Sequence, residues 1–307
     1  MIRLVVIGAG IICQEHLKTI NTINKFKIVG ISSRTSRKAY FLAKKFRIKK
    51  VYKSIDNMIS QEKPDAIAVF VSAENMYKVL RKVIKYKTTF FFEKPAALNY
   101  RQTKNLQLMA NKFKVKNMVG LNRRFYSVFK KGKDFLKKHG GAKAFLIEGH
   151  ERFWKISNKI NKQVYKNWIY ANGIHTIDLI RFFGGEYKEL KSFCNNQGIY
   201  KNITISLKFK NKLIGTYISN WGSPGGWSVS LFGNRHTIIY KPLENGIIVD
   251  RKFNTKKIQV NKKDIKFKTG FYAQMKCFEK LVSTGKLVKP AQGLNDLIQT
   301  INLIKKI

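Results

Sequence analysis

The stretch IRLVVIGAGIICQEHL, residues 2–17, decides the fold class of this chain. Residues 2–7 are apolar and largely β-branched, which predicts a buried strand. Gly8-Ala9-Gly10 predicts a tight turn, and a helical stretch opens at Gln14. Because glycine lets backbone N–H groups approach a pyrophosphate that the helix start then stabilises, this strand, turn and helix predict dinucleotide binding. The expected contacts are Gly8, Gly10, Ile11 and Ile12, and Cys13 takes the small third position of the fingerprint.

Strand and helix patterns alternate up to about residue 120, which is typical of a parallel sheet with helices on both faces. After that point, short strand patterns dominate, and residues 203–209 alternate between apolar and polar, the period of a sheet buried on one face. We therefore expect a dinucleotide-binding domain over residues 1–119 and a second domain over residues 120–307. The expected strands are 27–32, 66–72, 88–93, 117–121, 144–148, 203–209, 213–219, 228–232, 237–240, 247–249 and 257–260; the expected helices are 38–46, 76–84, 99–113, 174–183, 271–281 and 296–304. The last helix is expected to pack back against the first domain.

The composition is strongly basic, with 61 Lys+Arg against 17 Asp+Glu and a formal net charge of +44. This excess could indicate a nucleic-acid-binding protein, because lysine and arginine neutralise phosphates. The bases are spread along the chain, are mostly lysine and accompany no nucleic-acid motif, so we expect no specific nucleic-acid partner. The excess favours a negatively charged substrate instead.

The positions of the cysteines and the hydropathy of the chain exclude several other classes of protein. Cys13, Cys194 and Cys277 are far apart, which excludes a disulfide scaffold and zinc sites built on paired thiols. We expect no metal. The apolar segment over residues 4–13 is too short to span a membrane and no cleavage site follows it. We therefore expect a cytoplasmic protein with no membrane partner.

The end of the second expected strand bears on the choice of cofactor. An acidic residue that binds the ribose 2′-hydroxyl is usual there. This chain has Ser33-Arg34-Thr35 instead, and no acid occurs from Lys25 through Lys50. Arg34 could stack on adenine and pair with a 2′-phosphate, so we predict NADP in preference to NAD. The alternative is that Arg34 is one more surface base in a basic chain.

Further motifs carry a family resemblance. Glu93-Lys94-Pro95 ends a buried strand, and His16 follows Gly8-Ala9-Gly10 after five intervening residues. Downstream motifs are residues 120–125 (GLNRRF), residues 173–178 (GIHTID), Trp221, Gly233 and residues 270–272 (GFY). In these motifs the chain resembles, along essentially its whole length, the glucose–fructose oxidoreductase / inositol dehydrogenase / MocA (Gfo/Idh/MocA) family.

The resemblance implies a fold and an activity. The fold would be α/β, with an N-terminal Rossmann domain and a C-terminal α+β domain built on a large, mainly antiparallel open sheet. Homo-oligomers, dimers or tetramers, would form through that sheet. The activity would be NAD(P)-dependent oxidation or reduction of a CH–OH or C=O carbon in a sugar or nucleotide sugar, in surface polysaccharide or amino-sugar metabolism.

The same resemblance implies the site residues. Lys94 would polarise the reacting oxygen and His175 would transfer the proton, as the two catalytic residues. Both would contact the substrate. The remaining implied contacts are Arg124 and Asn172 to the substrate, and Ser33, Arg34, Ser72, Glu93, Lys94, Pro95 and Asn122 to the cofactor. Specificity would lie in two loops, 151–166 and 221–227.

Two departures from the family pattern leave an alternative open. Ala171 stands where many members carry an aspartate, and the following Asn172 cannot transfer a proton. Tyr170 is a candidate substitute. Tyr77 stands where a histidine is common after the third expected strand. A non-catalytic cofactor-binding sensor or scaffold is therefore the alternative function.

Overall fold

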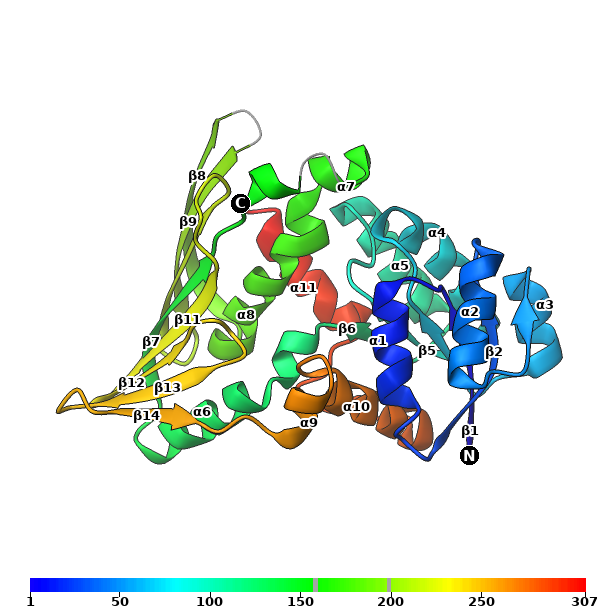
Figure 1. Cartoon of the computed structure of the whole chain (residues 1–307). Coiled ribbons are helices and arrows are strands. Elements are labelled where there is room, and N and C mark those ends of the chain that lie inside the picture. The colour runs from blue at the N-terminus through cyan, green and yellow to red at the C-terminus, as the bar shows by residue number, and fades with distance from the viewer. Residues whose placement is uncertain (157–159, 198–199) are drawn as a thin grey trace. The chain divides into compact units, whose positions relative to one another are not determined.

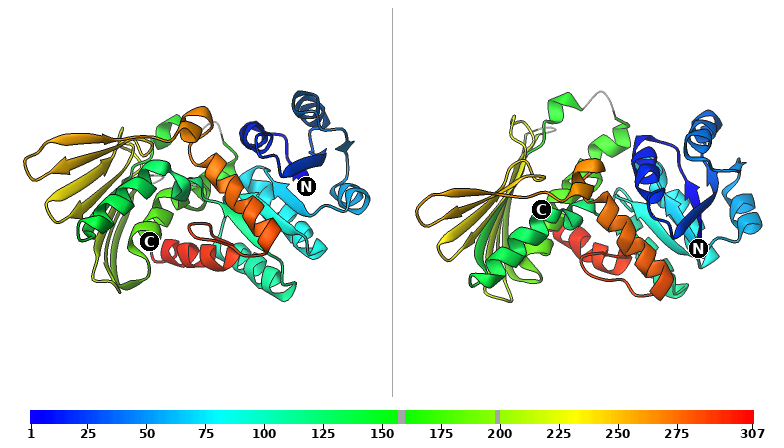
Figure 2. Two further views of the ribbon diagram at one scale, coloured as in Figure 1. Left: turned by 90° about the horizontal axis from the view of Figure 1, so that it is seen from below. Right: turned by 60° about the horizontal axis from the view of Figure 1, so that its bottom comes forward.

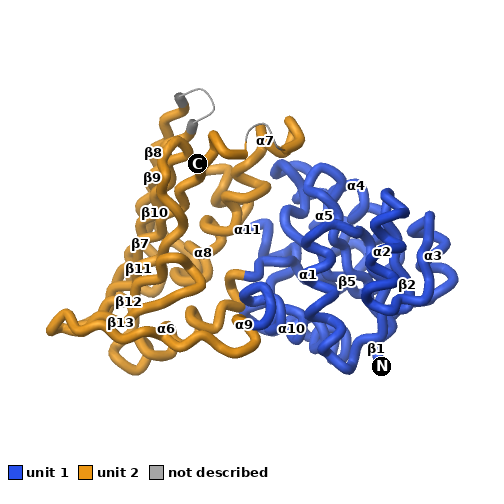
Figure 3. The backbone as a smooth tube through the Cα atoms, viewed as in Figure 1, with its two compact units in different colours: residues 1–122, 266–299 blue, residues 123–265, 300–307 orange. Residues whose placement is uncertain are grey.

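The computed structural model describes residues 1–156, 160–197 and 200–307. The chain divides into two compact units (Figure 3). Unit 1 comprises residues 1–122 and 266–299, and unit 2 comprises residues 123–265 and 300–307. The expected division kept residues 266–299 in the second domain, whereas they cluster with unit 1. The reason is aromatic packing. The ring of Phe278 in this segment stacks on the ring of Phe26, and its centroid lies 5.6 Å from that of Phe91.

Unit 1 contains a six-stranded sheet in which every neighbouring pair is parallel, in the order β3-β2-β1-β4-β5-β6. Residues of the central strands, such as Val5, Ile67 and Phe91, are wholly buried because helices cover both faces. The predicted Rossmann-type parallel sheet is confirmed. The strands are β1 (Ile2–Ile7), β2 (Phe26–Ser32), β3 (Val51–Tyr52), β4 (Ala66–Val69), β5 (Thr89–Glu93) and β6 (Asn117–Gly120).

The helices of unit 1 follow the predicted alternation, and the side chain of Asn99 caps α5 by accepting the Gln102 N–H. The short α3 was not predicted. The last helix, α11 (Leu294–Ile304), belongs to unit 1 up to Gln299, and Leu294 N–H donates to Asn117 Oδ1 at 2.8 Å. The others are α1 (Ile11–Ile20), α2 (Ser36–Phe46), α3 (Ile55–Glu62), α4 (Ala73–Val83), η1 (Ile84–Tyr86), α5 (Tyr100–Lys112) and α10 (Phe271–Thr284).

Unit 2 is built on an eight-stranded sheet in the order β14-β13-β12-β11-β7-β10-β9-β8. All neighbouring pairs are antiparallel except β7 and β10, so the predicted mainly antiparallel sheet is confirmed. The unpredicted strand β8 is largely exposed and therefore lacks the alternation that marks a half-buried strand. The strands are β7 (Ala142–Gly149), β8 (Tyr187–Gln197), β9 (Tyr200–Phe209), β10 (Ile214–Asn220), β11 (Trp227–Gly233), β12 (His236–Tyr240), β13 (Gly246–Asp250) and β14 (Thr255–Ile258).

Helices α6 (Ser127–Lys138) and α8 (Ile174–Gly184) pack on one face of this sheet (Figures 1 and 2). A side chain at Gly149 would meet the Tyr217 hydroxyl at 2.5 Å and Thr176 Oγ1 at 2.7 Å, so glycine lets α8 lie directly on β7 and β10. The opposite face exposes apolar side chains, among them Phe193 and Ile214. Shorter helical segments are η3 (Phe153–Lys155), α7 (Lys162–Lys166), the π turn η5 (Ile169–Gly173) and α9 (Lys262–Lys266).

Across the described ranges, no helix is both long and apolar enough to cross a membrane. The loop expected to set specificity over residues 151–166 includes residues 157–159, which lie outside the described residues.

Candidate active site

The glycine turn between β1 and α1 is shaped for an anion. Gly8 has a φ of +116°, and a side chain there would clash with the Phe70 carbonyl oxygen just past β4. Gly10 is the N-cap of α1, and a Cβ added to it meets nothing within 4 Å. The space in front of the helix start is therefore open, and the first N–H groups of α1 are available to a phosphate. A pyrophosphate-containing cofactor fits this turn.

A pocket of about 630 Å³ lies beside the turn. Five predicted cofactor residues line it, namely Gly8, Gly10, Ser33, Arg34 and Ser72. The predicted Ile11 and Ile12 are outside its lining and form the first turn of α1, where Ile11 is 82% exposed. The lining residues are Ile7, Gly8, Ala9, Gly10, Ser32, Ser33, Arg34, Thr35, Lys38, Lys53, Ser54, Ile55, Phe70, Val71, Ser72, Asn75, Lys78, Val79 and Lys82.

The pocket is basic, and its described lining contains no carboxylate. Sequence reasoning missed Lys53, Lys78 and Lys82 as lining residues. Lys53 follows the two-residue strand β3, which is too short to leave a pattern. Lys78 and Lys82 are four residues apart on α4, and this i,i+4 spacing was the one available signal. The structure therefore surrounds the pocket with more positive charge than Arg34 alone predicted.

Glu93 has a structural partner instead of facing the pocket. Its Oε1 lies 2.7 Å from Nε2 of His16, which is wholly buried on α1 and stacks between Phe70 and Phe271. The pair joins α1 to the end of β5, and the expected contact of Glu93 with the cofactor stays a prediction. Glu93 thus anchors the strand end from which Lys94 and Pro95 follow, joined by a cis peptide bond.

Lys94 is half-buried and Pro95 is buried, and neither lines the described pocket. Asn122, a predicted cofactor contact, is also buried, and its side-chain amide donates to the Thr269 carbonyl at 3.0 Å. The amide thus holds the returning segment 266–299 beside β6. The expected contact of Asn122 with the cofactor stays a prediction.

In unit 2, His175 is the second residue of α8 and is 4% exposed. Its ring lies 5.9 Å from the indole of Trp227 on β11, and the Arg123 guanidinium lies 4.6 Å from the same indole. The preceding turn, η5, is a π turn, a backbone form that is frequent at functional sites. Burial raises the pKa of Tyr170 in that turn, so its hydroxyl is a poor base near neutral pH.

Asn172, predicted to contact the substrate, bonds a carboxylate that sequence reasoning missed. Its Nδ2 donates to Oε1 of Glu151 at 3.0 Å and to Oε2 at 3.2 Å. Glu151 is 6% exposed and follows β7. From the sequence, Glu151 was identified only as the first residue of a loop, because an isolated acid in a loop has no periodicity that would mark it as functional.

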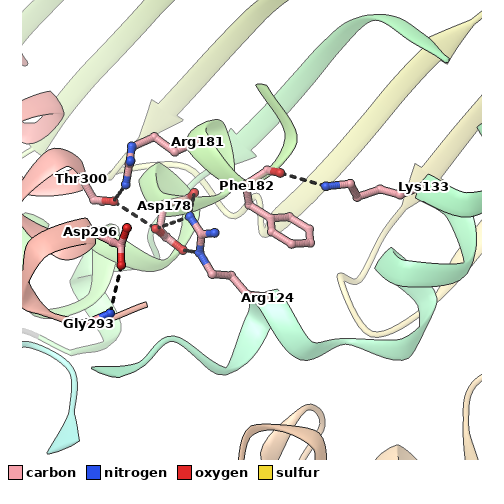
Figure 4. A network of polar contacts seen from close by, with 8 residues as sticks. All are labelled: Arg124, Lys133, Asp178, Arg181, Phe182, Gly293, Asp296 and Thr300. Atoms are coloured by element: carbon pink, nitrogen blue, oxygen red, sulfur yellow. Dashed lines mark hydrogen bonds and ion pairs between the residues drawn. The ribbon is translucent and has the colours of Figure 1, made fainter. Parts of the chain in front are cut away.

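Arg124, predicted to bind substrate, forms a buried ion pair with Asp178 (Figure 4). Its Nε and Nη2 donate to the two carboxylate oxygens at 2.6 and 2.9 Å, and Thr300 Oγ1 donates to Oδ1 at 3.0 Å. Two guanidinium nitrogens thus bond Asp178, and the expected contact of Arg124 with the substrate stays a prediction. The pair fixes α8 to the segment before α6 and to the end of α11.

Comparisons with known proteins match these features. Residues 2–121 match the oxidoreductase family model with an NAD-binding Rossmann fold, and residues 145–239 match the GFO/IDH/MocA C-terminal domain. The chain is 23% identical over 254 residues to myo-inositol 2-dehydrogenase of Thermotoga maritima, covering 77% of this chain and 74% of that protein.

Solved structures share the fold at low sequence identity. An oxidoreductase from Agrobacterium radiobacter, solved with NAD+, L-tartaric acid and magnesium, superposes with a TM-score of 0.80 at 15% identity, over 99% of this chain and 94% of that one. UDP-N-acetylglucosamine 3-dehydrogenase from Acidithiobacillus ferrooxidans has a TM-score of 0.79 at 15% identity, over 100% and 96%. The chain belongs to the Gfo/Idh/MocA family of oxidoreductases, and is a nicotinamide-dependent dehydrogenase or reductase of that family.

Proposed function

We propose that the protein is an NADP(H)-preferring oxidoreductase that transfers a hydride between nicotinamide and a carbon of a sugar or nucleotide sugar, in surface polysaccharide or amino-sugar metabolism. The observation that carries the proposal is the basic pocket beside the glycine turn, which combines an open helix start with the bases at the end of β2.

The preference for NADP(H) rests on charge. Arg34 and Lys38 line the pocket from the end of β2 and from α2, and Lys53 lines it after β3. A carboxylate at this place would accept the 2′-hydroxyl of NAD and repel a 2′-phosphate, whereas these bases attract the phosphate. Ser33 Oγ accepts the Thr35 N–H at 3.3 Å and so holds the loop that presents Arg34.

The substrate class rests on the relatives and on the charge of the chain. One relative acts on myo-inositol and one structural neighbour on UDP-N-acetylglucosamine, so ring hydroxyls are the common target. A net charge of +44 favours an anionic member of this class, such as a nucleotide sugar.

The chemistry divides between two side chains. Nicotinamide, when bound, accepts or supplies the hydride. Lys94 would donate a hydrogen bond from its ammonium to the reacting oxygen and stabilise the negative charge that develops there. In oxidation, His175 would take the hydroxyl proton on a ring nitrogen, and in reduction it would return that proton.

The experiment follows nicotinamide absorbance with a panel of sugars and nucleotide sugars. Lys94→Ala and His175→Ala should each lower kcat by about 100-fold or more, the usual size of a general acid–base contribution. Exposed residues of the same types serve as controls, and Lys85→Ala and His139→Ala should keep wild-type rates. Undiminished turnover in both site variants would refute the assignment.

The alternative, a cofactor-binding sensor or scaffold, is favoured by Ala171, which removes an ionisable side chain from the turn before His175. It predicts that the wild-type protein binds the cofactor and turns over no member of the panel. The same measurement therefore separates the two functions.

We also propose that two or more copies associate through the sheet of unit 2. Helices α6 and α8 cover one face of that sheet, while the other exposes Ile214 and Ile218 on β10, Phe193 on β8 and Phe232 on β11. Apolar side chains gathered on an exposed sheet face are typical of an association surface.

A further inference from the structure

The turn that precedes His175 contains no side chain that can exchange a proton near neutral pH. Ala171 and Asn172 cannot ionise, and burial raises the pKa of Tyr170 further above its usual value near 10. A reaction that places a proton on His175 is assisted by an anion that stabilises the imidazolium.

Two buried carboxylates of the described chain lie close to the first turns of α8, Asp178 and Glu151. Asp178 is committed to Arg124 and Thr300 through three hydrogen bonds. Glu151 follows the end of β7, where its backbone N–H donates to the Asn220 carbonyl at 3.0 Å and so extends the pairing of the sheet. Its place is therefore set by the backbone of the sheet.

The side chain of Glu151 is directed toward the turn that carries His175. Both carboxylate oxygens accept from Asn172 Nδ2, and Asn172 lies three residues before His175. Residues three apart on a helical turn share one face, with Cβ atoms about 5–6 Å apart. These hydrogen bonds place the carboxylate beside the turn from which His175 follows.

The surroundings support this position. Tyr217 on β10 bonds Thr176 Oγ1 at 3.2 Å, directly beside His175 in the chain. Burial raises the pKa of Tyr217 to about 12, and the Glu151 charge adds to that rise. The Glu151 charge therefore acts on the residue packed beneath the first turn of α8.

We propose that Glu151 is the positioning acid of the reaction centre. Its carboxylate orients Asn172 toward the substrate and stabilises the protonated form of His175. Hydride leaves the substrate carbon for nicotinamide, the hydroxyl proton passes to the His175 ring, and Glu151 stays ionised beside the new imidazolium. The inference rests on the proposed function, since it assigns a role within the same reaction.

Other groups also face the first turn of α8. They are Tyr217 from β10, Tyr170 from η5, Arg123 across Trp227, and Asp178 of α8 itself with its partner Arg124. They are unchanged in Glu151→Gln, so a difference between that variant and the wild type measures Glu151 alone.

The first measurement uses the full-length protein without cofactor, labelled with ¹⁵N-histidine, and follows the His175 ring by NMR as pH changes. His175→Gln identifies the signal among the five histidines. Glu151→Gln should lower the midpoint of His175 protonation by about one pH unit, because a nearby carboxylate favours the charged ring. Glu148→Gln, which removes a carboxylate of β7 that pairs with Ile218 and Ser228 on the face opposite α8, should leave the midpoint within a few tenths of a unit.

The second measurement is turnover with the substrate found in the panel. Glu151→Gln should lower kcat at least tenfold with KM changed less than threefold, and shift the acidic limb of the pH profile with the NMR midpoint. Glu151→Asp keeps the charge but not the reach to Asn172, so it should retain the midpoint and lower kcat. This variant also tests the proposal if Glu151→Gln does not fold.

An unchanged His175 midpoint, or wild-type kcat in Glu151→Gln or in Glu151→Asp, would overturn the role of Glu151. Failure of the proposed function looks different, because His175→Ala would then keep full turnover, or no substrate would turn over, while the NMR titration would still report on Glu151.

Discussion

At the scale of single residues, Arg34 carries the most specific prediction. It is exposed at the end of β2 and lines the basic pocket. Arg34→Ala should weaken NADPH binding by about tenfold to a hundredfold and change NADH binding little, because a charge-assisted bond to a phosphate contributes about 1.5–3 kcal/mol. Fluorescence titration of each nucleotide gives the two dissociation constants.

Arg37→Ala is the matched control, since Arg37 is an equally exposed base on α2 that does not line the pocket. It should leave both dissociation constants unchanged. Tighter binding of NADH than of NADPH by the wild-type protein would contradict the proposed preference for NADP(H).

Three predicted site residues, Glu93, Asn122 and Arg124, proved to have structural partners. Each stands in a motif that resembles the family pattern, yet each side chain bonds a neighbour from a distant part of the chain. A polar residue in a motif can contact a ligand or hold the backbone that presents the ligand site. Only the position of the partner separates the two roles, and the partner is remote in sequence.

At the scale of elements, Glu62 joins three parts of unit 1. Its Oε2 accepts from Arg3 on β1 at 2.9 Å, and its Oε1 pairs with Lys50 at 2.8 Å and bonds the hydroxyl of Tyr52 on β3. Burial alone would raise the pKa of Glu62, but the bonds from Lys50 and Tyr52 and the charges of Lys50 and Arg3 outweigh it and lower the pKa.

This lowered pKa predicts an acid dependence of stability. A carboxylate whose folded pKa is depressed adds stability above its unfolded pKa of about 4.3, and that stability is lost as pH falls through the folded value. Glu62→Gln should therefore lower the free energy of unfolding by about 1 kcal/mol at pH 7, a modest loss because Arg3 and Lys50 stay hydrated. The deficit should shrink as pH falls below 4.

Urea unfolding at a series of pH values measures this effect. Glu15→Gln, which removes an exposed i,i+3 pair with Lys18 on α1, is the control and should show no such pH-dependent deficit. A deficit of Glu62→Gln that stays constant between pH 7 and pH 3 would contradict the role of the ionised carboxylate.

At the scale of the whole molecule, the exposed face of the unit 2 sheet predicts self-association. Ile214 is 57% exposed and Phe193 is 71% exposed. The double variant Phe193→Lys/Ile214→Lys should shift the protein toward monomer, because each interface would then bury unpaired charges. Light scattering coupled to size exclusion gives the mass of each variant.

Phe41→Lys on α2 is the control for this experiment, since Phe41 is 60% exposed on unit 1. Its mass should equal that of the wild type. A monomeric wild-type protein, or a double variant with wild-type mass, would contradict association through this sheet.

The sequence by itself determined the fold class, the order of most elements and the glycine turn. These features are local, since strand and helix periods and the φ requirement of Gly8 act within a few residues. Buried central strands such as β4 and β5 can be predicted from the sequence because the residues on both of their faces are apolar. The elements β3, β8 and α3 lack such a pattern and were not predicted, and the helices α6, α7 and α9 were not predicted either.

Only the tertiary structure decided which polar side chains meet. Glu151 and Asn172 are 21 residues apart, His16 and Glu93 are 77 apart, and Arg124 and Asp178 are 54 apart. The return of residues 266–299 to unit 1 is of the same kind, since it depends on aromatic packing against Phe26 and Phe91. Hydrogen bonds and side-chain packing depend on distance in space, and separation along the chain does not determine that distance.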